Sequence, residues 1–183
     1  MKSVIIAITG ASGVNLGLKL INEAKKYAKI HAVISHAAKK TLLLEEGIEI
    51  SKFEDKGVKF YDDDDTGAAI ASGSFKIDAM IVAPCSINTL AKIHAGFADT
   101  LITRAAAVSL KERRRLFLAV REMPFSTISL EHMSKLSLCG AVIAPPILGY
   151  YSGVKTLKDM ENFIIGKWLD LLDIENEIYK RWN

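Results

Sequence analysis

Cysteine and histidine are scarce in this sequence, and their positions exclude two kinds of small protein. Cys85 and Cys139 are the only cysteines among 183 residues, too few for a disulfide framework or a four-ligand zinc site. The four histidines show no metal-ligand spacing, so no metal is predicted. We expect Cys85 to be a small buried thiol, because no histidine adjoins it in the sequence to activate it as a nucleophile.

Long hydrophobic runs and a large charge of one sign are also missing. No stretch reaches the ~18 uninterrupted apolar residues of a membrane span. The first apolar run, residues 4–8, passes into a glycine-rich turn and is too short for a signal peptide. The 24 basic and 21 acidic residues leave a net charge of +3, which favours neither a nucleic-acid nor a membrane surface. We therefore expect a cytoplasmic protein that binds no nucleic acid and no membrane.

Short apolar runs alternate with helical patterns along the chain. Strands are predicted at residues 3–8, 30–34, 58–61, 79–83, 116–120 and 141–144, and helices at about 14–28, 37–46, 86–95, 101–110, 127–138 and from 156 onward. Strands that are apolar throughout indicate a parallel sheet covered on both faces. The predicted fold class is α/β, a three-layer, doubly wound parallel sheet. One domain is expected over residues 1–183, with a C-terminal helical tail over about 156–183.

In such a sheet ligands bind beyond the carboxyl ends of the strands, so the residues after each strand are the candidates. Gly10, Ala11 and Ser12 follow the first strand. A glycine turn before a helix suits a phosphate, and it is equally common for packing reasons. Ser35 follows the second strand, where an NAD-binding fold usually carries an acidic residue. The absence of that residue favours a mononucleotide over NAD.

Two further strand ends carry polar residues. Ser86, Ile87, Asn88 and Thr89 form a turn at a helix start, which indicates either a second ligand contact or simple N-capping by Ser86. Arg121 and Glu122 follow the strand at 116–120. They form either a phosphate fork with an acid or base beside it, or a surface ion pair.

Three other segments are less informative. The basic run 111–115 and the four aspartates at 62–65 are interpreted as a solvated helix end and a solvated loop. Residues 72–74, Ser-Gly-Ser, form either a turn that suits an anion or an ordinary loop. These residues together predict a mononucleotide- or phosphate-binding α/β domain, and they assign no reaction.

Nine segments in the same order resemble the UbiX-type flavin prenyltransferases over nearly the whole chain. They are TGASG at 9–13, ASGS at 71–74, VAPCS at 82–86 with Thr89 and Leu90, RAA at 104–106, LKERR at 110–114, REMPFS at 121–126, LEHM at 130–133, GAVIAP at 140–145 and GYY at 149–151. The resemblance implies a Rossmann-like or flavodoxin-like fold and a homo-oligomer, typically a dodecamer, with active sites where subunits meet. It implies transfer of a dimethylallyl group from dimethylallyl phosphate to N5 and C6 of reduced FMN, without a metal. The product, prenylated FMN, would serve UbiD-type decarboxylases.

The resemblance also implies the roles of individual residues. The FMN contacts it implies are Gly10, Ala11, Ser12, Ser35, Ser86, Ile87, Asn88, Thr89 and Arg121. The dimethylallyl phosphate contacts are Ser72, Gly73, Arg104, Lys111, Arg121, Glu122, Tyr151 and Lys167, with Glu45 from a neighbouring subunit. Glu122 and Ser12 would move protons, and Arg104 and Lys111 would stabilise the leaving phosphate.

The sequence departs from the family pattern at several positions. Lys167 stands where arginine is usual, which keeps the charge and loses the bidentate fork. Leu16 and Ala107 replace a usual tyrosine and a common aspartate, and residues 47–67 carry no transferable site.

Two other functions remain as alternatives. An FMN-dependent cysteine decarboxylase shares the fold, but this chain has PCSINT at 84–89 in place of a PASANT-like turn, and PPILGYYSG at 145–153 in place of a PxMNxxMW-like segment. A non-catalytic FMN carrier would not need a second phosphate clamp.

Overall fold

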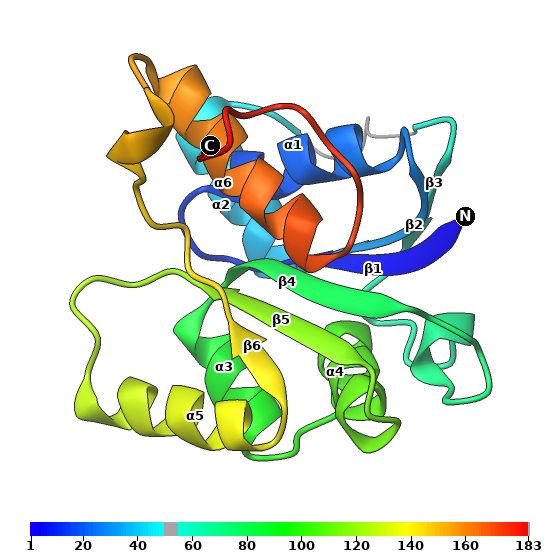
Figure 1. Ribbon diagram of the computed structural model, residues 1–183. Coiled ribbons are helices and arrows are strands. Elements are labelled where there is room, and N and C mark those ends of the chain that lie inside the picture. The colour runs from blue at the N-terminus through cyan, green and yellow to red at the C-terminus, as the bar shows by residue number, and fades with distance from the viewer. Residues whose placement is uncertain (50–54, 183) are drawn as a thin grey trace.

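The computed structural model describes residues 1–49 and 55–182, and within them a single parallel sheet of six strands forms the middle layer (Figure 1). The strands are β1 (Lys2–Ile8), β2 (Ala28–Ile34), β3 (Val58–Tyr61), β4 (Ala79–Cys85), β5 (Arg115–Val120) and β6 (Ala141–Ile143). Their order across the sheet is β3-β2-β1-β4-β5-β6. The predicted α/β class with a doubly wound parallel sheet is confirmed.

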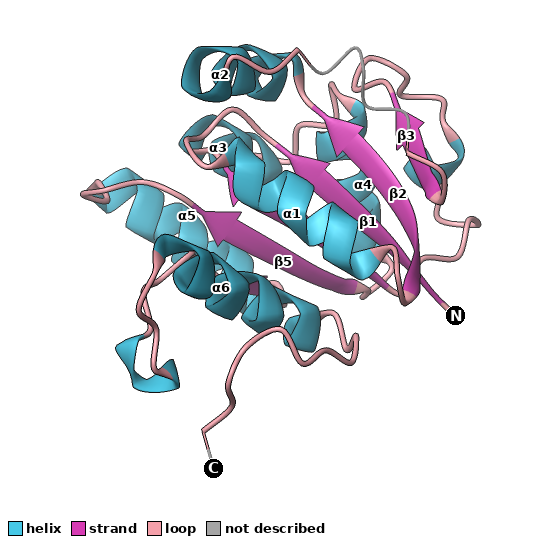
Figure 2. Ribbon diagram, turned by 90° about the horizontal axis from the view of Figure 1, so that it is seen from above, coloured by secondary structure: helices cyan, strands magenta, loops and turns pink. Residues whose placement is uncertain are grey.

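Helices cover both faces of this sheet (Figures 1 and 2). One layer consists of α1 (Val14–Ala24), α2 (His36–Glu46) and α6 (Leu157–Leu171); the other consists of α3 (Ile87–His94), α4 (Leu101–Lys111) and α5 (Thr127–Leu138). Short 3₁₀ helices occur at η2 (Ala69–Ala71) and η3 (Tyr150–Ser152). Successive residues of one strand enter different cores: Val4 and Ile6 pack with α1 and α6, whereas Ile5 and Ala7 pack with α3 and α4. This is why the strands are apolar at every position.

Two helices end earlier than the sequence pattern predicts. The first ends at Ala24, because β2 begins at Ala28 and pairs with Lys2 of β1. The last ends at Leu171, and the chain to residue 182 is not helical. Polar contacts hold this C-terminal segment against α6, since Tyr179 and Arg181 both donate to the Asp170 carboxylate, at 2.6 and 2.8 Å.

The aspartate run 62–65 and the basic run 111–115 were both expected to be solvated, and each contains one residue that is not. The expectation is wrong for Asp63 and for Arg114. Asp63, within the run of four aspartates, is 6% exposed and bonds to the start of α4. Arg114, within the basic run, is half-buried and donates to main-chain carbonyls of residues 73 and 75. The segment 47–67 lies partly outside the described residues.

No helix within residues 1–49 and 55–182 combines the length and the apolar composition needed to cross a bilayer.

His31 is a buried polar residue in the middle of β2. It is 1% exposed, and its two ring nitrogens lie 3.1 Å from the Ser3 hydroxyl and 2.9 Å from the Tyr61 hydroxyl. Burial lowers the pKa of His31 to about 4, and the nearby cations Lys29 and Lys59 add to this effect. The folded protein therefore holds this imidazole neutral.

This predicts a loss of stability in mild acid that His31→Gln reduces. Protonation favours the unfolded chain, so the contribution of His31 is complete above pH 6.5 and is lost as the pH falls toward 4. The difference between a pKa of 6.5 and one of about 4 corresponds to about 3 kcal/mol. Urea unfolding at a series of pH values should give a shallower dependence for His31→Gln than for the wild type. An equal dependence of stability on pH in the two proteins would contradict the conclusion that His31 is buried in its neutral form.

Candidate functional site

The direction in which the chain adds strands reverses between β1 and β4, and Thr9 joins the ends of these two strands. Connections from β1 run outward through β2 to β3, and those from β4 run the other way through β5 to β6. Thr9 donates from its hydroxyl to the Pro84 carbonyl at 2.8 Å, and the same oxygen accepts from the Ser86 amide at 2.8 Å. Doubly wound sheets bind ligands at such a reversal. The turns at 9–13 and 86–89 meet at this point.

Three helices begin at this edge of the sheet. α2 and α3 are capped by their own serines, since Ser35 accepts from the Ala38 amide at 3.1 Å and Ser86 from the Thr89 amide at 3.2 Å. α1 has no side-chain cap; its N-cap residue is Gly13, whose φ of 90° is left-handed and favours glycine. The Gly13 amide instead donates to the Glu45 carboxylate of the same chain at 3.2 Å. An anion therefore already contacts the positive end of α1.

The residues predicted to contact FMN gather at this edge. Gly10, Ala11 and Ser12 form the turn after β1, and Ser12 is exposed. A side chain at Gly10 would come within 2.5 Å of Ala37 in α2, so Gly10 allows the turn and α2 to approach closely. Ser35, Ser86, Ile87, Asn88 and Thr89 begin the two neighbouring helices. The N-termini of α1, α2 and α3 converge here, and that of α1 contacts the Glu45 carboxylate. Such an arrangement fits the phosphate of a mononucleotide.

Cys85 lies next to this edge but is not available for chemistry. Its side chain is fully buried, and burial raises the pKa of the thiol to about 12. The thiol is therefore protonated at neutral pH, and the prediction of a small buried thiol is confirmed.

Arg121 and Glu122 follow β5 and are both exposed. The Arg121 amide donates to the Cys85 carbonyl at 3.0 Å, which fixes this residue to the end of β4. Glu122 accepts from the Met123 amide at 3.0 Å, and the ion pairs found among residues 1–49 and 55–182 include none between Glu122 and Arg121. Both side chains line a cavity of about 380 Å³. The two charges thus remain available, and the alternative of a mutual surface ion pair is wrong.

Tyr151 and Lys167 line a second cavity, of about 350 Å³ and mostly apolar. It adjoins the first, since Pro145 and Ile147 line both. The Tyr151 ring meets the Phe163 ring edge-on, with centroids 5.4 Å apart. The side chain of Lys167 is the single charged group of this lining.

Ser72, Gly73, Arg104 and Lys111 form a third group, around α4. Arg104 and Lys111 are seven residues apart in α4 and so share one of its faces. Arg104 donates to the Ala71 carbonyl at 3.4 Å, and Lys111 forms an ion pair with Glu112. That ion pair lowers the pKa of the Glu112 carboxyl. The structure therefore brings Arg104 and Lys111 beside the turn that contains Ser72 and Gly73.

Lys111 and Arg121 lie at opposite ends of the same strand. Lys111 precedes β5 and Arg121 follows it, and the six residues of β5 span about 17 Å. The Lys111 ammonium lies beside Gly73 and the Arg121 side chain lines the cavity at the other end of β5, so the two cations of a single chain do not converge on one point. A clamp that uses both needs a second copy of the chain.

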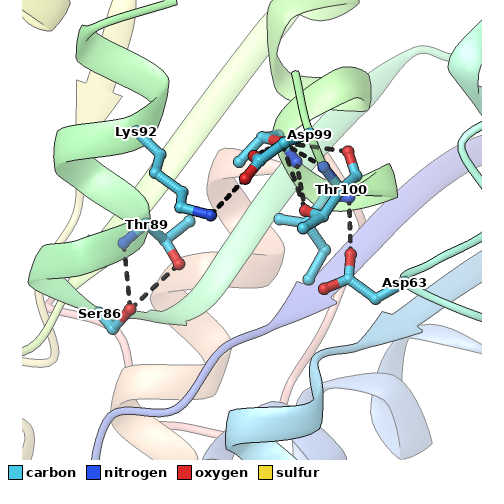
Figure 3. A network of polar contacts seen from close by, with 8 residues as sticks. Asp63, Ser86, Thr89, Lys92, Asp99 and Thr100 are labelled. Atoms are coloured by element: carbon cyan, nitrogen blue, oxygen red, sulfur yellow. Dashed lines mark hydrogen bonds and ion pairs between the residues drawn. The ribbon is translucent and has the colours of Figure 1, made fainter. Parts of the chain in front are cut away.

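Sequence reasoning missed the side-chain contacts that join α3, α4 and the loop at Asp63. Lys92 of α3 donates to Asp99 at 2.5 Å (Figure 3). Asp99 also accepts from the Thr103 hydroxyl of α4. Asp63 accepts from the Ile102 amide at 3.0 Å and so holds the start of α4 (Figure 3). The sequence shows that Lys92, Asp99 and Asp63 are charged, but it does not show which groups they contact in the fold.

One cluster could hold a cation by geometry alone. The ligand atoms of His36, Asp62 and Asp64 lie within 4.8 Å of one another, and all three residues are exposed. Exposed acidic groups of this kind are common without an ion, so we assign no metal to it.

Comparison with known proteins agrees with this geometry. The Flavoprotein family model matches residues 1–174. The flavin prenyltransferase UbiX of Campylobacter jejuni is 50% identical over 182 residues, which cover 98% of this chain and 97% of that protein.

Two solved structures have the same fold over the full chain. AnUbiX (PadA1), crystallised in complex with FMN and dimethylallyl pyrophosphate, has a TM-score of 0.95 at 39% identity, covering 100% of this chain and 97% of that one. A dodecameric FMN-dependent UbiX-like decarboxylase from Escherichia coli O157:H7 has a TM-score of 0.91 at 39% identity, covering 100% of both chains. The chain therefore belongs to the Flavoprotein family and, within it, to the UbiX flavin prenyltransferases.

Proposed function

We propose that this protein joins a dimethylallyl group from dimethylallyl phosphate to N5 and C6 of reduced FMN, making prenylated FMN. The observation that carries this proposal is a second set of charged groups beyond those that hold a mononucleotide phosphate. Arg104 and Lys111 lie beside an exposed Ser-Gly turn, and Arg121 and Glu122 line a cavity at the end of β5. Flavin binding alone does not use Arg104, Lys111 or Glu122, whereas transfer from a phosphate ester does.

The edge between β1 and β4 is the proposed flavin site. The N-termini of α1, α2 and α3 would hold the phosphate, with polar contacts from Ser12, Asn88 and Arg121. Reduced FMN supplies the ring atoms that accept the dimethylallyl group. Binding the phosphate at Gly13 would also release the Glu45 carboxylate that contacts this amide. Glu45 would then be free to serve a site shared with a neighbouring subunit.

The proposed phosphate clamp draws on two copies of the chain. One copy would supply Ser72, Gly73, Arg104 and Lys111, and another would supply Arg121 and Glu122, because β5 separates the two sets within one chain. Three cations around one phosphate stabilise the charge that grows on it as the carbon–oxygen bond breaks. A homo-oligomer, for which we propose a dodecamer, follows from this requirement.

Proton transfer is assigned to exposed side chains beside the clamp. Glu122 accepts a hydrogen bond from the Met123 amide, and its carboxylate can take or give a proton. Ser12 lies in the turn before α1 and can relay a proton at the flavin. The apolar cavity beside Tyr151 would keep water from the cation-like allyl fragment, and Lys167 would add one more positive charge.

The remaining assignments follow from this chemistry. Lys167 offers the phosphate a point charge in place of a fork. The product would pass to a UbiD-type decarboxylase, and the protein would act in the cytoplasm. A carrier role leaves the clamp without a purpose, and the buried Cys85 gives no support to thiol chemistry.

The activity predicts a specific change in the mass of the flavin. Anaerobic incubation of the protein with reduced FMN and dimethylallyl phosphate should release a flavin heavier by one C5 prenyl unit, as measured by mass spectrometry. Omission of dimethylallyl phosphate should leave FMN unchanged. Unmodified FMN in the complete mixture, from protein that binds FMN, would contradict the proposed function.

Glu122→Gln should separate turnover from flavin binding. Removing a general acid–base group typically costs about 10²- to 10⁴-fold, so turnover should fall by at least about 100-fold while FMN affinity stays within about twofold. Glu131→Gln, which removes an exposed carboxylate of α5, is the matched control and should retain full turnover. Normal turnover in Glu122→Gln would remove Glu122 from the proton-transfer step.

A further inference from the structure

Arg114 points back into the protein and not toward solvent. Its guanidinium donates to the Gly73 carbonyl at 2.6 Å and to the Phe75 carbonyl at 3.0 Å. These two carbonyls belong to the turn that contains Ser72 and Gly73. Within the basic run 111–115, Arg114 is therefore committed to the main chain, whereas Lys111 presents its ammonium beside the turn.

The carbonyls held by Arg114 determine where the donors of the turn face. Carbonyl and amide of a trans peptide point in opposite directions, so fixing the Gly73 carbonyl turns the Ser74 amide away from Arg114. That amide donates to the Ser72 hydroxyl at 3.3 Å, and the two serine hydroxyls lie 2.8 Å apart. Ser72 and Ser74 are both exposed. The turn thus presents a hydroxyl pair on the side opposite Arg114.

At Gly73 this turn lies against the Lys111 ammonium, one of the cations of the proposed phosphate clamp. A side chain there would come within 2.9 Å of the Lys111 ammonium and 2.5 Å of the Glu112 carboxylate. The missing Cβ therefore leaves room for the ends of these two flexible side chains beside the turn.

The same segment is held at the other end of α4 by Asp63. The Asp63 carbonyl accepts from the Leu101 amide at 2.7 Å, and its carboxylate accepts from the Ile102 amide at 3.0 Å (Figure 3). Between the two anchors, Ile70 and Ala71 are buried, and Arg104 donates to the Ala71 carbonyl. The chain from Asp63 to Phe75 is thus fixed along α4 from one end of the helix to the other.

We propose that Arg114 is a positioning residue for the prenyl donor. It holds the Ser72–Phe75 turn in the orientation that lets Ser72 and Lys111 contact the phosphate of dimethylallyl phosphate together. We assign Arg114 no contact with the phosphate, because its guanidinium donates to the Gly73 and Phe75 carbonyls on the side of the turn opposite the hydroxyl pair. This inference rests on the proposed function and adds to it a residue that acts through main-chain geometry.

The test compares Arg114→Gln with Arg113→Gln. Both remove one positive charge at adjacent positions. Arg113 is exposed, and its side chain forms no hydrogen bond or ion pair with the residues described. Binding of dimethylallyl phosphate is measured by calorimetry on protein loaded with oxidised FMN, which cannot turn over. Arg114→Gln should weaken this binding about tenfold or more, and Arg113→Gln less than about threefold, while FMN affinity stays unchanged in both.

Three further measurements separate positioning from folding or charge. In turnover, Arg114→Gln should raise KM for dimethylallyl phosphate more than it lowers kcat. The Ser74 and Phe75 amides should exchange with solvent faster in Arg114→Gln than in the wild type. Arg114→Lys, which keeps the charge and can reach one carbonyl, should bind dimethylallyl phosphate with intermediate affinity.

The outcomes distinguish this inference from the function it rests on. Equal weakening in Arg114→Gln and Arg113→Gln would show an effect of charge alone and overturn the positioning role. Unchanged donor binding in Arg114→Gln would overturn it as well. If wild-type protein loaded with FMN binds no dimethylallyl phosphate, the proposed function fails, and the role of Arg114 in it fails with it.

Discussion

The reversal of the sheet between β1 and β4 is the constraint on which the site depends. Thr9 holds the two strand ends together through the Pro84 carbonyl and the Ser86 amide. β1 and β4 are parallel neighbours, and the connections that follow them run to opposite sides of the sheet, so α1 and α3 begin beside each other on opposite faces, with α2 next to them (Figure 2). Their N-termini create a positive edge without a concentration of basic residues. This explains how a chain with a net charge of +3 can offer a phosphate site.

The length of β5 imposes the second constraint. It places Lys111 and Arg121 at opposite ends of one strand. A phosphate clamp that uses both therefore has to draw on two copies of the chain. The account therefore links oligomerisation to catalysis directly. Assembly would complete the site, and the positions of Arg114 and Asp63 would determine how accurately one copy presents its half. Both residues act on the main chain of the segment that carries Ser72 and Gly73.

Much of the fold was predictable because its signals are local. Continuous apolar runs such as residues 79–83 mark buried parallel strands, and the capping box at Thr156 and Asp159 marks the start of α6. The residues at the strand ends were predictable for the same reason. Asp63 and Arg114 were not, because each lies in a run of like charges, and only tertiary position decides which member of the run is buried. Glu45 reaches Gly13 across 32 residues, and no sequence pattern indicates that contact.

Subunit mixing tests the composite clamp most directly. Lys111→Ala and Arg121→Ala should each be nearly inactive alone. Co-assembled in equal amounts, they should recover toward about one quarter of wild-type activity, because each site then draws its two cations from different copies independently. Lys111→Ala mixed with Arg104→Ala should recover nothing, since both residues lie on one face of the same α4. No recovery in the first mixture, with co-assembly demonstrated, would contradict the account and show that each chain builds its own clamp.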